Sequence, residues 1–420
     1  MQNTEQNWDC VIIGGGIAGL IASIYLARAE KSVLILEKAK TLGGRGRTTV
    51  KMDSYLNLGP HALYSKGLAI ETLRELGIEL EGGIVPTRGK MIHNGEIFDI
   101  PASPFILVTS TLLNWNAKKE LLSFFLKYKK MKTDGFKNVP LAQWLQHRIK
   151  DKLARNLILM LSRLSSYSDE SDRLSAGAAI KQLQLGNAMY LNKGWQSMID
   201  ALINKAVEFG VQFQTVKHVN KVTGSFPDLS VQTNKEIIYA KNVLSTSSPQ
   251  ETSKLLKEYK CTPEFIKKDY IPVHAACLDL VLSKVPNPNI DFAMGVEDPF
   301  YFSNHSKIAK LSNQDHQVIH VMKYGISNQE TEKELEEFME IVQPGWEEFV
   351  IYKRYLPRMT VSNRLVLASN DDEVSPLVSQ IPGFYIAGDW VGDAMLAEAS
   401  FQSGRKAAQF ILEKFSIKVV

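Results

Sequence analysis

The first 37 residues contain the pattern that most constrains this chain: strand, glycine-rich turn, helix and a second strand that ends in an acid. Residues 8–13 are uniformly suited to a buried strand, residues 17–29 to an apolar, alanine-rich helix, and residues 32–36 to the second strand. The turn between the first strand and the helix has the spacing G-x-G-x-x-G, formed by Gly14, Gly16 and Gly19. Such glycines permit a tight turn, close approach of a pyrophosphate and close packing of helix on strand. The order of these elements predicts a dinucleotide-binding unit of an α/β fold.

The second strand ends at Glu37, 18 residues after Gly19. A carboxylate there can accept hydrogen bonds from a ribose 2′-hydroxyl, and it would repel a 2′-phosphate. The free N–H groups of the helix N-terminus favour the phosphates, with roughly half a positive charge. The residues expected to touch the dinucleotide here are Gly14, Gly15, Gly16, Ile17, Ala18, Gly19, Glu37 and Lys38.

Three further segments decide which dinucleotide is expected. Leu42-Gly43-Gly44-Arg45 follows the second strand, Gly59-Pro60-His61-Ala62 follows a third strand, and Gly388-Asp389 near the C-terminus precedes a helix rich in small residues. Together these motifs resemble the flavoprotein superfamily of amine oxidases, protoporphyrinogen oxidases and phytoene desaturases. The resemblance runs from about residue 8 to 412, and it is faint across 100–185 and 257–345. Thr41 and Lys193 stand where that superfamily often has Arg and Gly.

The resemblance implies FAD as the cofactor. The C-terminal motif contains no Cys or His for covalent attachment, so non-covalent binding is expected. An aspartate at the Gly388 turn can hold ribityl hydroxyls or phosphates, and a following helix N-terminus would stabilise negative charge on the flavin ring. The additional FAD contacts implied are Gly43, Gly44, Arg45, Gly59, Pro60, His61, Ala62, Val219, Gly388, Asp389, Met395 and Leu396.

Hydrophobic periodicity predicts two domains, each assembled from separate parts of the chain. A Rossmann-like FAD-binding domain is expected from residues 1–85, 188–256 and 351–420. An inserted α+β substrate domain with a helical cap is expected from residues 86–187 and 257–350. Its predicted elements are a hairpin at 91–98 with Asn94-Gly95 at the tip, helices throughout 102–183, strands at 271–282 and 317–324, and a charged helix at 330–342.

Two residues are candidates for catalysis. His61 could gate the substrate or move a proton, because histidine titrates near neutrality; a packing role is the alternative. Lys323 occupies a strand of the inserted domain and resembles the lysine that holds a water near the flavin in amine oxidases, although a surface lysine on a strand is the simpler interpretation. Tyr385 and Trp390 could form the aromatic pair of an amine oxidase, but Tyr385 lies within a predicted buried strand.

Composition excludes several other classes of protein. Apolar content of 45%, charged content of 22% and a net charge of +4 are ordinary for a globular protein and indicate no nucleic-acid partner. The cysteines Cys10, Cys261 and Cys277 have no C-x-x-C spacing, and the histidines form no metal-binding pattern. There is no second G-x-G-x-x-G for a nicotinamide nucleotide, so oxygen, a quinone or another acceptor is expected. We expect a cytoplasmic protein.

Residues 115–132 bear on the location and the substrate. Leu121, Phe124, Phe125 and Tyr128 recur at helical spacing beside a lysine-rich flank. This pattern fits a helix lying on an anionic membrane, but it fits somewhat better a cap helix that packs inward with a solvated lysine face.

These features predict an FAD-dependent oxidoreductase that transfers hydride from a C–H of a lipophilic small molecule, desaturase-like or protoporphyrinogen-oxidase-like, to flavin N5. The alternatives are a flavin amine oxidase and a non-catalytic lipid-binding protein of the GDP-dissociation-inhibitor type, which shares the fold. The intact cofactor motifs favour an enzyme.

Overall fold

The nucleotide-binding part of the molecule is built on a mostly parallel sheet. In this computed structural model, which describes residues 7–368 and 373–416, the sheet has the strand order β10-β2-β1-β13-β12-β11, and β19 pairs with β13. Its central strands are apolar because both faces are covered. The bounds are β1 (Trp8–Ile13), β2 (Val33–Glu37), β10 (Gln212–Thr215), β11 (Val219–Ser225), β12 (Asp228–Thr233), β13 (Ile237–Ser245) and β19 (Phe384–Ile386). The predicted α/β fold with a Rossmann-like unit is confirmed.

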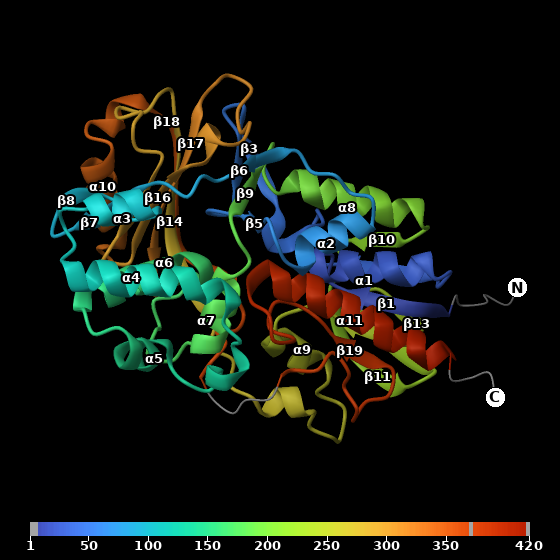
Figure 1. The fold of residues 1–420 in the computed structure, drawn as a ribbon. Helices are drawn as coiled ribbons and strands as arrows, with labels where there is room; N and C mark the ends of the chain where they lie inside the picture. The colour runs from blue at the N-terminus through green and yellow to red at the C-terminus, as the bar shows by residue number, and fades with distance from the viewer. Residues whose placement is uncertain (1–6, 369–372, 417–420) are drawn as a thin grey trace, which may run out of the picture.

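One face of this sheet is covered by four helices from distant parts of the chain. These are α1 (Ile17–Arg28), α2 (Leu68–Glu75), α8 (Gln196–Glu208) and α11 (Leu396–Ser416), and they share one core with the strands. Figure 1 shows α1 and α11 side by side. They cross so closely that a Cβ added at Gly404 would lie 2.5 Å from the Ala18 carbonyl oxygen. On the opposite face, α9 (Pro249–Leu255) shares a core with side chains of the sheet.

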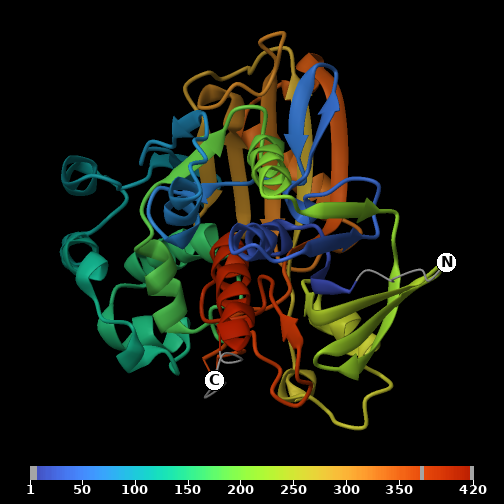
Figure 2. The same ribbon diagram turned by 90° about the vertical axis from the view of Figure 1, so that its right-hand side faces the viewer.

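The second large sheet has the order β18-β14-β17-β16-β15-β7-β8. Helix α10 (Thr331–Val342) packs on one face, and the helical layer α3–α7 packs on the other. Figure 2 shows this sheet above the nucleotide-binding part. The strands are β7 (Lys90–His93), β8 (Glu96–Asp99), β14 (Val273–Leu282), β15 (Phe292–Gly295), β16 (Phe300–Asn304), β17 (Gln317–Tyr324) and β18 (Val350–Ser362).

Several local predictions are confirmed in this second part. Asn94 and Gly95 both have positive φ at the turn between β7 and β8, as a two-residue hairpin requires. The predicted helical stretch contains α3 (Pro104–Thr109), α4 (Trp115–Lys127), α5 (Leu141–Arg148), α6 (Lys152–Ser166) and α7 (Ala176–Leu183).

The predicted domain boundary at residue 351 is wrong for one strand. β18 pairs with β14 along most of its length, from Val350 opposite Leu282 to Ser362 opposite Val273. It therefore belongs to the substrate sheet, and the chain returns to the nucleotide-binding part only after it. Two small sheets lie between the parts: β3 (Thr48–Lys51) with β4 (Ser54–Asn57), and β5 (Leu63–Tyr64) with β9 (Ala188–Leu191) and β6 (Gly82–Ile84).

Candidate functional site

One continuous cavity of about 1180 Å³ runs from the glycine-rich turn after β1 to the helical layer α3–α7. Pockets for drug-sized ligands span roughly 300–1,000 Å³. The cavity therefore has room for more than one such molecule. The predicted cofactor contacts that line it are Gly14, Gly16, Ile17, Ala18, Glu37, Lys38, Gly43, Gly44, Arg45, Pro60, His61, Ala62, Val219, Gly388, Asp389 and Leu396.

The glycines of the turn have distinct structural roles. Gly14 has φ +108°, and an added Cβ would lie 2.5 Å from Thr246 Oγ1. An added Cβ at Gly19 would lie 2.2 Å from the Gly14 carbonyl oxygen, so this position requires the close approach that only glycine permits. Nothing lies within 4 Å of a Cβ added at Gly16. Open space at the N-terminus of α1 is what a diphosphate needs there.

The Glu37 carboxylate is buried at the end of β2 and holds the turn. Its Oε2 accepts a hydrogen bond from the Gly15 N–H and its Oε1 accepts one from the Ala39 N–H, both at 2.8 Å. An ionised carboxylate has about four acceptor positions. Glu37 can therefore hold these backbone groups and still accept from ribose hydroxyls at the cavity surface.

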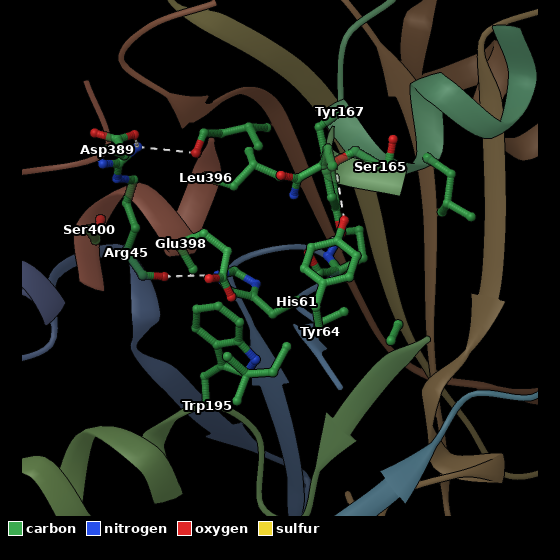
Figure 3. A pocket seen from close by; sticks show the side chains of 18 of the residues that line it. Arg45, His61, Tyr64, Ser165, Tyr167, Trp195, Asp389, Leu396, Glu398 and Ser400 are labelled. Atoms are coloured by element: carbon green, nitrogen blue, oxygen red, sulfur yellow. Dashed lines mark hydrogen bonds and ion pairs between the residues drawn. The ribbon is translucent and has the colours of Figure 1, made fainter. Parts of the chain in front are cut away.

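The Arg45 and Asp389 motifs meet through an ion pair. Arg45 Nη1 lies 2.8 Å from Asp389 Oδ2, and Asn363 donates to both carboxylate oxygens at 2.9 Å. Burial alone would raise the pKa of Asp389, but Arg45 and Asn363 hold that pKa below its usual value. The carboxylate is thus ionised and fixed where the two motifs border the cavity, as Figure 3 shows.

The start of α11 also borders the cavity. Leu396 and Ala397 line the cavity. Met395 is buried in the core and lines only a small neighbouring cavity. The predicted contact between Met395 and the cofactor is therefore not supported. Glu398 in the first turn is buried and accepts a hydrogen bond from the Ala69 N–H at 3.1 Å. Burial raises the pKa of Glu398. This acid belonged to a motif in the sequence but was not predicted as a site residue.

His61 is held rigidly in the cavity wall. Its Nδ1 lies 3.0 Å from the Gly59 carbonyl oxygen and its Nε2 lies 3.1 Å from the Arg45 carbonyl oxygen. Its ring contacts Trp195 edge-on, with centroids 4.7 Å apart. Burial lowers the pKa of His61, which favours a neutral ring. With both nitrogens facing carbonyl oxygens, this geometry favours a wall position over proton transfer.

Three other predicted residues lie away from the cavity. Lys323 forms an ion pair with Glu334 of α10 and is not a lining residue, so it lies apart from the cavity assigned to FAD. Tyr385 and Trp390 are both buried in the core, and the Trp390 indole donates to the Ser247 carbonyl at 2.9 Å. The predicted aromatic pair is not formed by these residues.

The cavity is instead lined by tyrosines that sequence reasoning missed. Tyr64 donates to the Ser165 carbonyl at 3.1 Å and Tyr167 donates to the Pro60 carbonyl at 3.3 Å (Figure 3). Tyr190 and Tyr301 complete the group. Burial raises the pKa of all of them, to about 12 for Tyr64, so they remain protonated at neutral pH. They come from β5, the end of α6, β9 and β16, and no spacing in the sequence connects them.

Helix α4 covers the outer arm of the cavity. Leu121 and Phe124 of the predicted stripe are buried, and Phe125 and Tyr128 are partly buried against the same core. The stripe therefore faces inward, as the cap-helix alternative predicted. Phe124, Phe125 and Tyr128 line the cavity from this side.

These observations fit a dinucleotide flavin. The open space at Gly16, the acceptors of Glu37 and the fixed carboxylate of Asp389 lie along one cavity, which continues past His61 into a larger apolar space. The open space at Gly16 suits the diphosphate of FAD, Glu37 suits the ribose, and Asp389 suits the ribityl chain.

Comparison with known proteins agrees with this geometry. Residues 12–76 match the family model described as NAD(P)-binding Rossmann-like domain. The chain is 45% identical over 71 residues to L-amino acid oxidase Cdc18 of Crotalus durissus cumanensis, which covers 17% of this chain and 14% of that protein. It is 28% identical over 191 residues to coproporphyrinogen III oxidase of Bacillus subtilis, which covers 41% of this chain and 39% of that protein. The matches thus span well under half of these relatives.

The fold extends this similarity over the whole chain. Cyclohexylamine oxidase from Brevibacterium oxydans superimposes with a TM-score of 0.71 at 14% identity, covering 98% of this chain and 100% of that structure. At that identity the likeness concerns the fold. Together with the matched dinucleotide-binding segment and the paired cofactor motifs, it assigns FAD to the cavity. The chain thus resembles FAD-dependent amine oxidases and porphyrinogen oxidases, in sequence over its dinucleotide-binding segment and in fold over almost its whole length.

Proposed function

We propose that this protein is an FAD-dependent oxidoreductase that oxidises a lipophilic small molecule. The observation that carries the proposal is the single cavity that joins the dinucleotide cradle to an apolar chamber. FAD, when bound, supplies the hydride acceptor, and the protein positions the substrate and excludes water. The alternative of a lipid-binding protein without redox activity receives less support, because the Gly16, Glu37 and Asp389 features fit a bound cofactor.

The lipophilic character follows from the chamber wall. Between α3 and the tyrosines the wall is formed mainly by large apolar side chains, among them Leu107, Leu157, Met160, Leu161, Leu164 and Phe292. Burying such surface against a ligand contributes about 25 cal/mol per Å². A substrate with a large apolar body gains most from this chamber, and the tyrosine hydroxyls can orient its few polar groups.

A flavin amine oxidase is the second candidate, and the tyrosines favour it. Tyr64, Tyr167, Tyr190 and Tyr301 place neutral aromatic side chains around one part of the cavity. Aromatic rings of this kind can flank an amine and attract its cation.

An anaerobic reduction assay distinguishes these functions. Purified holoenzyme is mixed with coproporphyrinogen III, protoporphyrinogen IX, a panel of L-amino acids, putrescine or cyclohexylamine, and the visible absorbance of the oxidised cofactor is followed. Bleaching by a porphyrinogen supports the first proposal, and bleaching by an amine supports the second. Protein that is purified without flavin and does not take up added FAD would contradict both.

We further propose that substrate enters from a membrane surface. Phe105, Trp115 and Leu126 are 76%, 68% and 71% exposed on α3 and α4, and Leu126 also lines the cavity mouth. Lysines of the same segment surround them, with Lys129 also at the mouth. Exposed apolar groups within a basic surface fit an anionic lipid headgroup layer. Among the described residues, no helix has the length and apolarity needed to cross a bilayer.

A further inference from the structure

A buried series of contacting polar side chains begins in the cavity wall and leads away from the cavity. It starts at Tyr301 on β16, whose hydroxyl lies 3.3 Å from that of Tyr190 and 3.4 Å from His305 Nε2. The His305 ring stacks on the Tyr190 ring, with centroids 3.6 Å apart. Both tyrosines line the cavity, whereas His305 lies behind them.

The series of contacting polar side chains continues into the substrate sheet. The rings of His305 and His320 meet edge-on with centroids 4.5 Å apart. His320 Nδ1 lies 2.6 Å from Asp279 Oδ1, and Arg354 donates to Asp279 Oδ2. His305, His320 and Asp279 are essentially inaccessible to solvent.

Three other titratable side chains of the chamber wall, Tyr64, Tyr167 and His61, face backbone carbonyl oxygens. Tyr64 and Tyr167 donate to backbone carbonyls, and both His61 nitrogens face carbonyl oxygens. Tyr301 differs because its hydroxyl contacts an imidazole nitrogen. A hydroxyl in that position can pass its own proton to the ring while accepting another from the cavity.

Burial keeps this pair uncharged while the cofactor is oxidised. Burial lowers the pKa of His305 well below its usual value, with smaller contributions from His320 and His61, and burial raises the pKa of Tyr301. The resting pair is therefore a neutral phenol beside a neutral imidazole. Burial would raise the pKa of Asp279, but His320 and Arg354 hold it below its usual value, so a negative charge stands behind His320.

His320 provides a second observation that points to proton transfer. Its Nε2 is buried and has no hydrogen-bond partner among the residues described. Buried polar atoms without a partner are uncommon and need an explanation. The groups that face His305 are Tyr190 from β9, Tyr301 from β16 and His320 from β17, with His61 at longer range.

We infer that Tyr301 and His305 form the acid–base pair of this enzyme, taking up the proton that the substrate loses on oxidation. The inference rests on the proposed function. We write X for the substrate atom next to the carbon that loses hydride. The X–H bond breaks and leaves its electron pair on X, while a new O–H bond forms on Tyr301. The original Tyr301 O–H bond breaks as a new N–H bond forms on His305 Nε2. The electron pair on X becomes the double bond as hydride leaves the neighbouring carbon for FAD.

The negative charge that two-electron reduction adds to the cofactor would favour an imidazolium at His305. His305 is therefore neutral with oxidised FAD and protonated with reduced FAD. The proton returns to the acceptor when the cofactor is reoxidised.

The pH dependence of the FAD midpoint potential tests this coupling without a substrate. Holoenzyme is equilibrated with a redox dye in the xanthine–xanthine oxidase system at pH values around neutrality. Wild type should take up about one more proton per two electrons than His305→Gln. His93→Gln, which changes a histidine on the β7–β8 hairpin, should match wild type. Equal slopes for wild type and His305→Gln would overturn the inference.

Two further measurements cover the case in which His305→Gln loses FAD. Ring-¹⁵N-labelled wild-type holoenzyme should show one additional protonated imidazole after reduction by dithionite, and an unchanged histidine spectrum would contradict the inference. With the reductant found in the anaerobic panel, Tyr301→Phe should slow bleaching roughly 10²-fold or more. The control Tyr259→Phe should not slow it, because the Tyr259 hydroxyl donates to the Gly224 carbonyl and does not line the cavity. If Tyr301→Phe is bleached at the wild-type rate, the inference would also be overturned. Wild-type protein without FAD would instead contradict the proposed function.

Discussion

Arg45 Nη1 and Asp389 Oδ2 lie 2.8 Å apart, although the two residues are 344 positions apart in the chain. The contact joins the motif after β2 to the motif before α11 at the border of the cavity. It keeps a buried carboxylate ionised and gives the guanidinium a fixed direction. Both ends of the FAD cradle therefore depend on one ion pair.

Replacing Asp389 with Asn should weaken FAD binding. The substitution removes the charge that pairs with Arg45 and leaves that guanidinium without its carboxylate. Hydrogen bonds to charged groups contribute about 1.5–3 kcal/mol, which corresponds to a roughly tenfold to hundredfold higher dissociation constant for FAD. The measurement is a titration of apoprotein with FAD. Asp393→Asn is the matched control, since Asp393 pairs with Lys181 near the surface and does not line the cavity. Equal weakening by both substitutions would contradict the assignment.

Stability should fall in two stages as the pH is lowered. The pKa values of His61 and His305 are lowered by burial, so the unfolded chain binds more protons below about pH 6.5 and stability starts to decline there. The pKa values of Asp279 and Asp389 are also below their usual value because of their cationic partners. Their contribution is fully present above about pH 3.9 and is lost as the pH falls through the folded-state values. Thermal unfolding across this pH range checks both stages. Asp389→Asn should reduce the loss of stability in the more acidic stage.

Glu37→Arg should yield mostly colourless protein, and Glu37→Gln should retain part of the flavin. The Glu37 carboxylate accepts from both the Gly15 and Ala39 N–H groups, and Gln keeps one of these acceptors. Flavin is measured in the supernatant after acid precipitation, which also tests non-covalent binding. Exposed Glu79→Arg is the control. Flavin that stays with the wild-type pellet would mean a covalent bond, and a full flavin content in Glu37→Arg would remove this residue from the site.

Trp115→Glu combined with Leu126→Glu should reduce binding to anionic vesicles at least tenfold. Each apolar side chain contributes roughly 1.5–3 kcal/mol when fully buried, and the added charges oppose the headgroups. The assay is co-sedimentation with phosphatidylglycerol vesicles, where wild-type binding should weaken in high salt. The control places Glu at Val216 and Ile237, which are exposed on the nucleotide-binding part. If wild type does not sediment with these vesicles, the proposed membrane contact is wrong.

NADH and NADPH should leave the oxidised flavin spectrum nearly unchanged under anaerobic conditions. The chain contains one G-x-G-x-x-G, and its residues line the end of the cavity assigned to FAD. A nicotinamide dinucleotide would need a second phosphate-binding turn to hold it near the flavin. Rapid bleaching by NADPH would identify the protein as a reductase.

The β1–α1–β2 unit could be predicted because its requirements are local. Gly14 and Gly19 are needed by the turn itself, whatever the remaining chain does. The Asn94-Gly95 hairpin is predictable for the same reason, since both residues adopt positive φ.

Other features depend on tertiary contacts, which the hydrophobic periodicity of the sequence does not reveal. The stripe of Leu121 and Phe124 has the spacing of an apolar helix face, but spacing alone does not say whether protein or lipid covers it. β18 alternates like a strand of either domain, and only its register with β14 assigns it. Asp279 meets His320 and Arg354 across sequence separations of 41 and 75 residues, so no motif could reveal this cluster.

The close crossing of α1 and α11 at Ala18 and Gly404 has a consequence for biosynthesis. The helix that presents its N-terminus to the dinucleotide phosphates is synthesised well before the helix that packs against it. While the ribosome is still adding α11, the cradle lacks the wall formed by Gly388, Asp389 and Leu396. FAD can therefore be enclosed in its final position only after the start of α11 has been translated and has folded against α1.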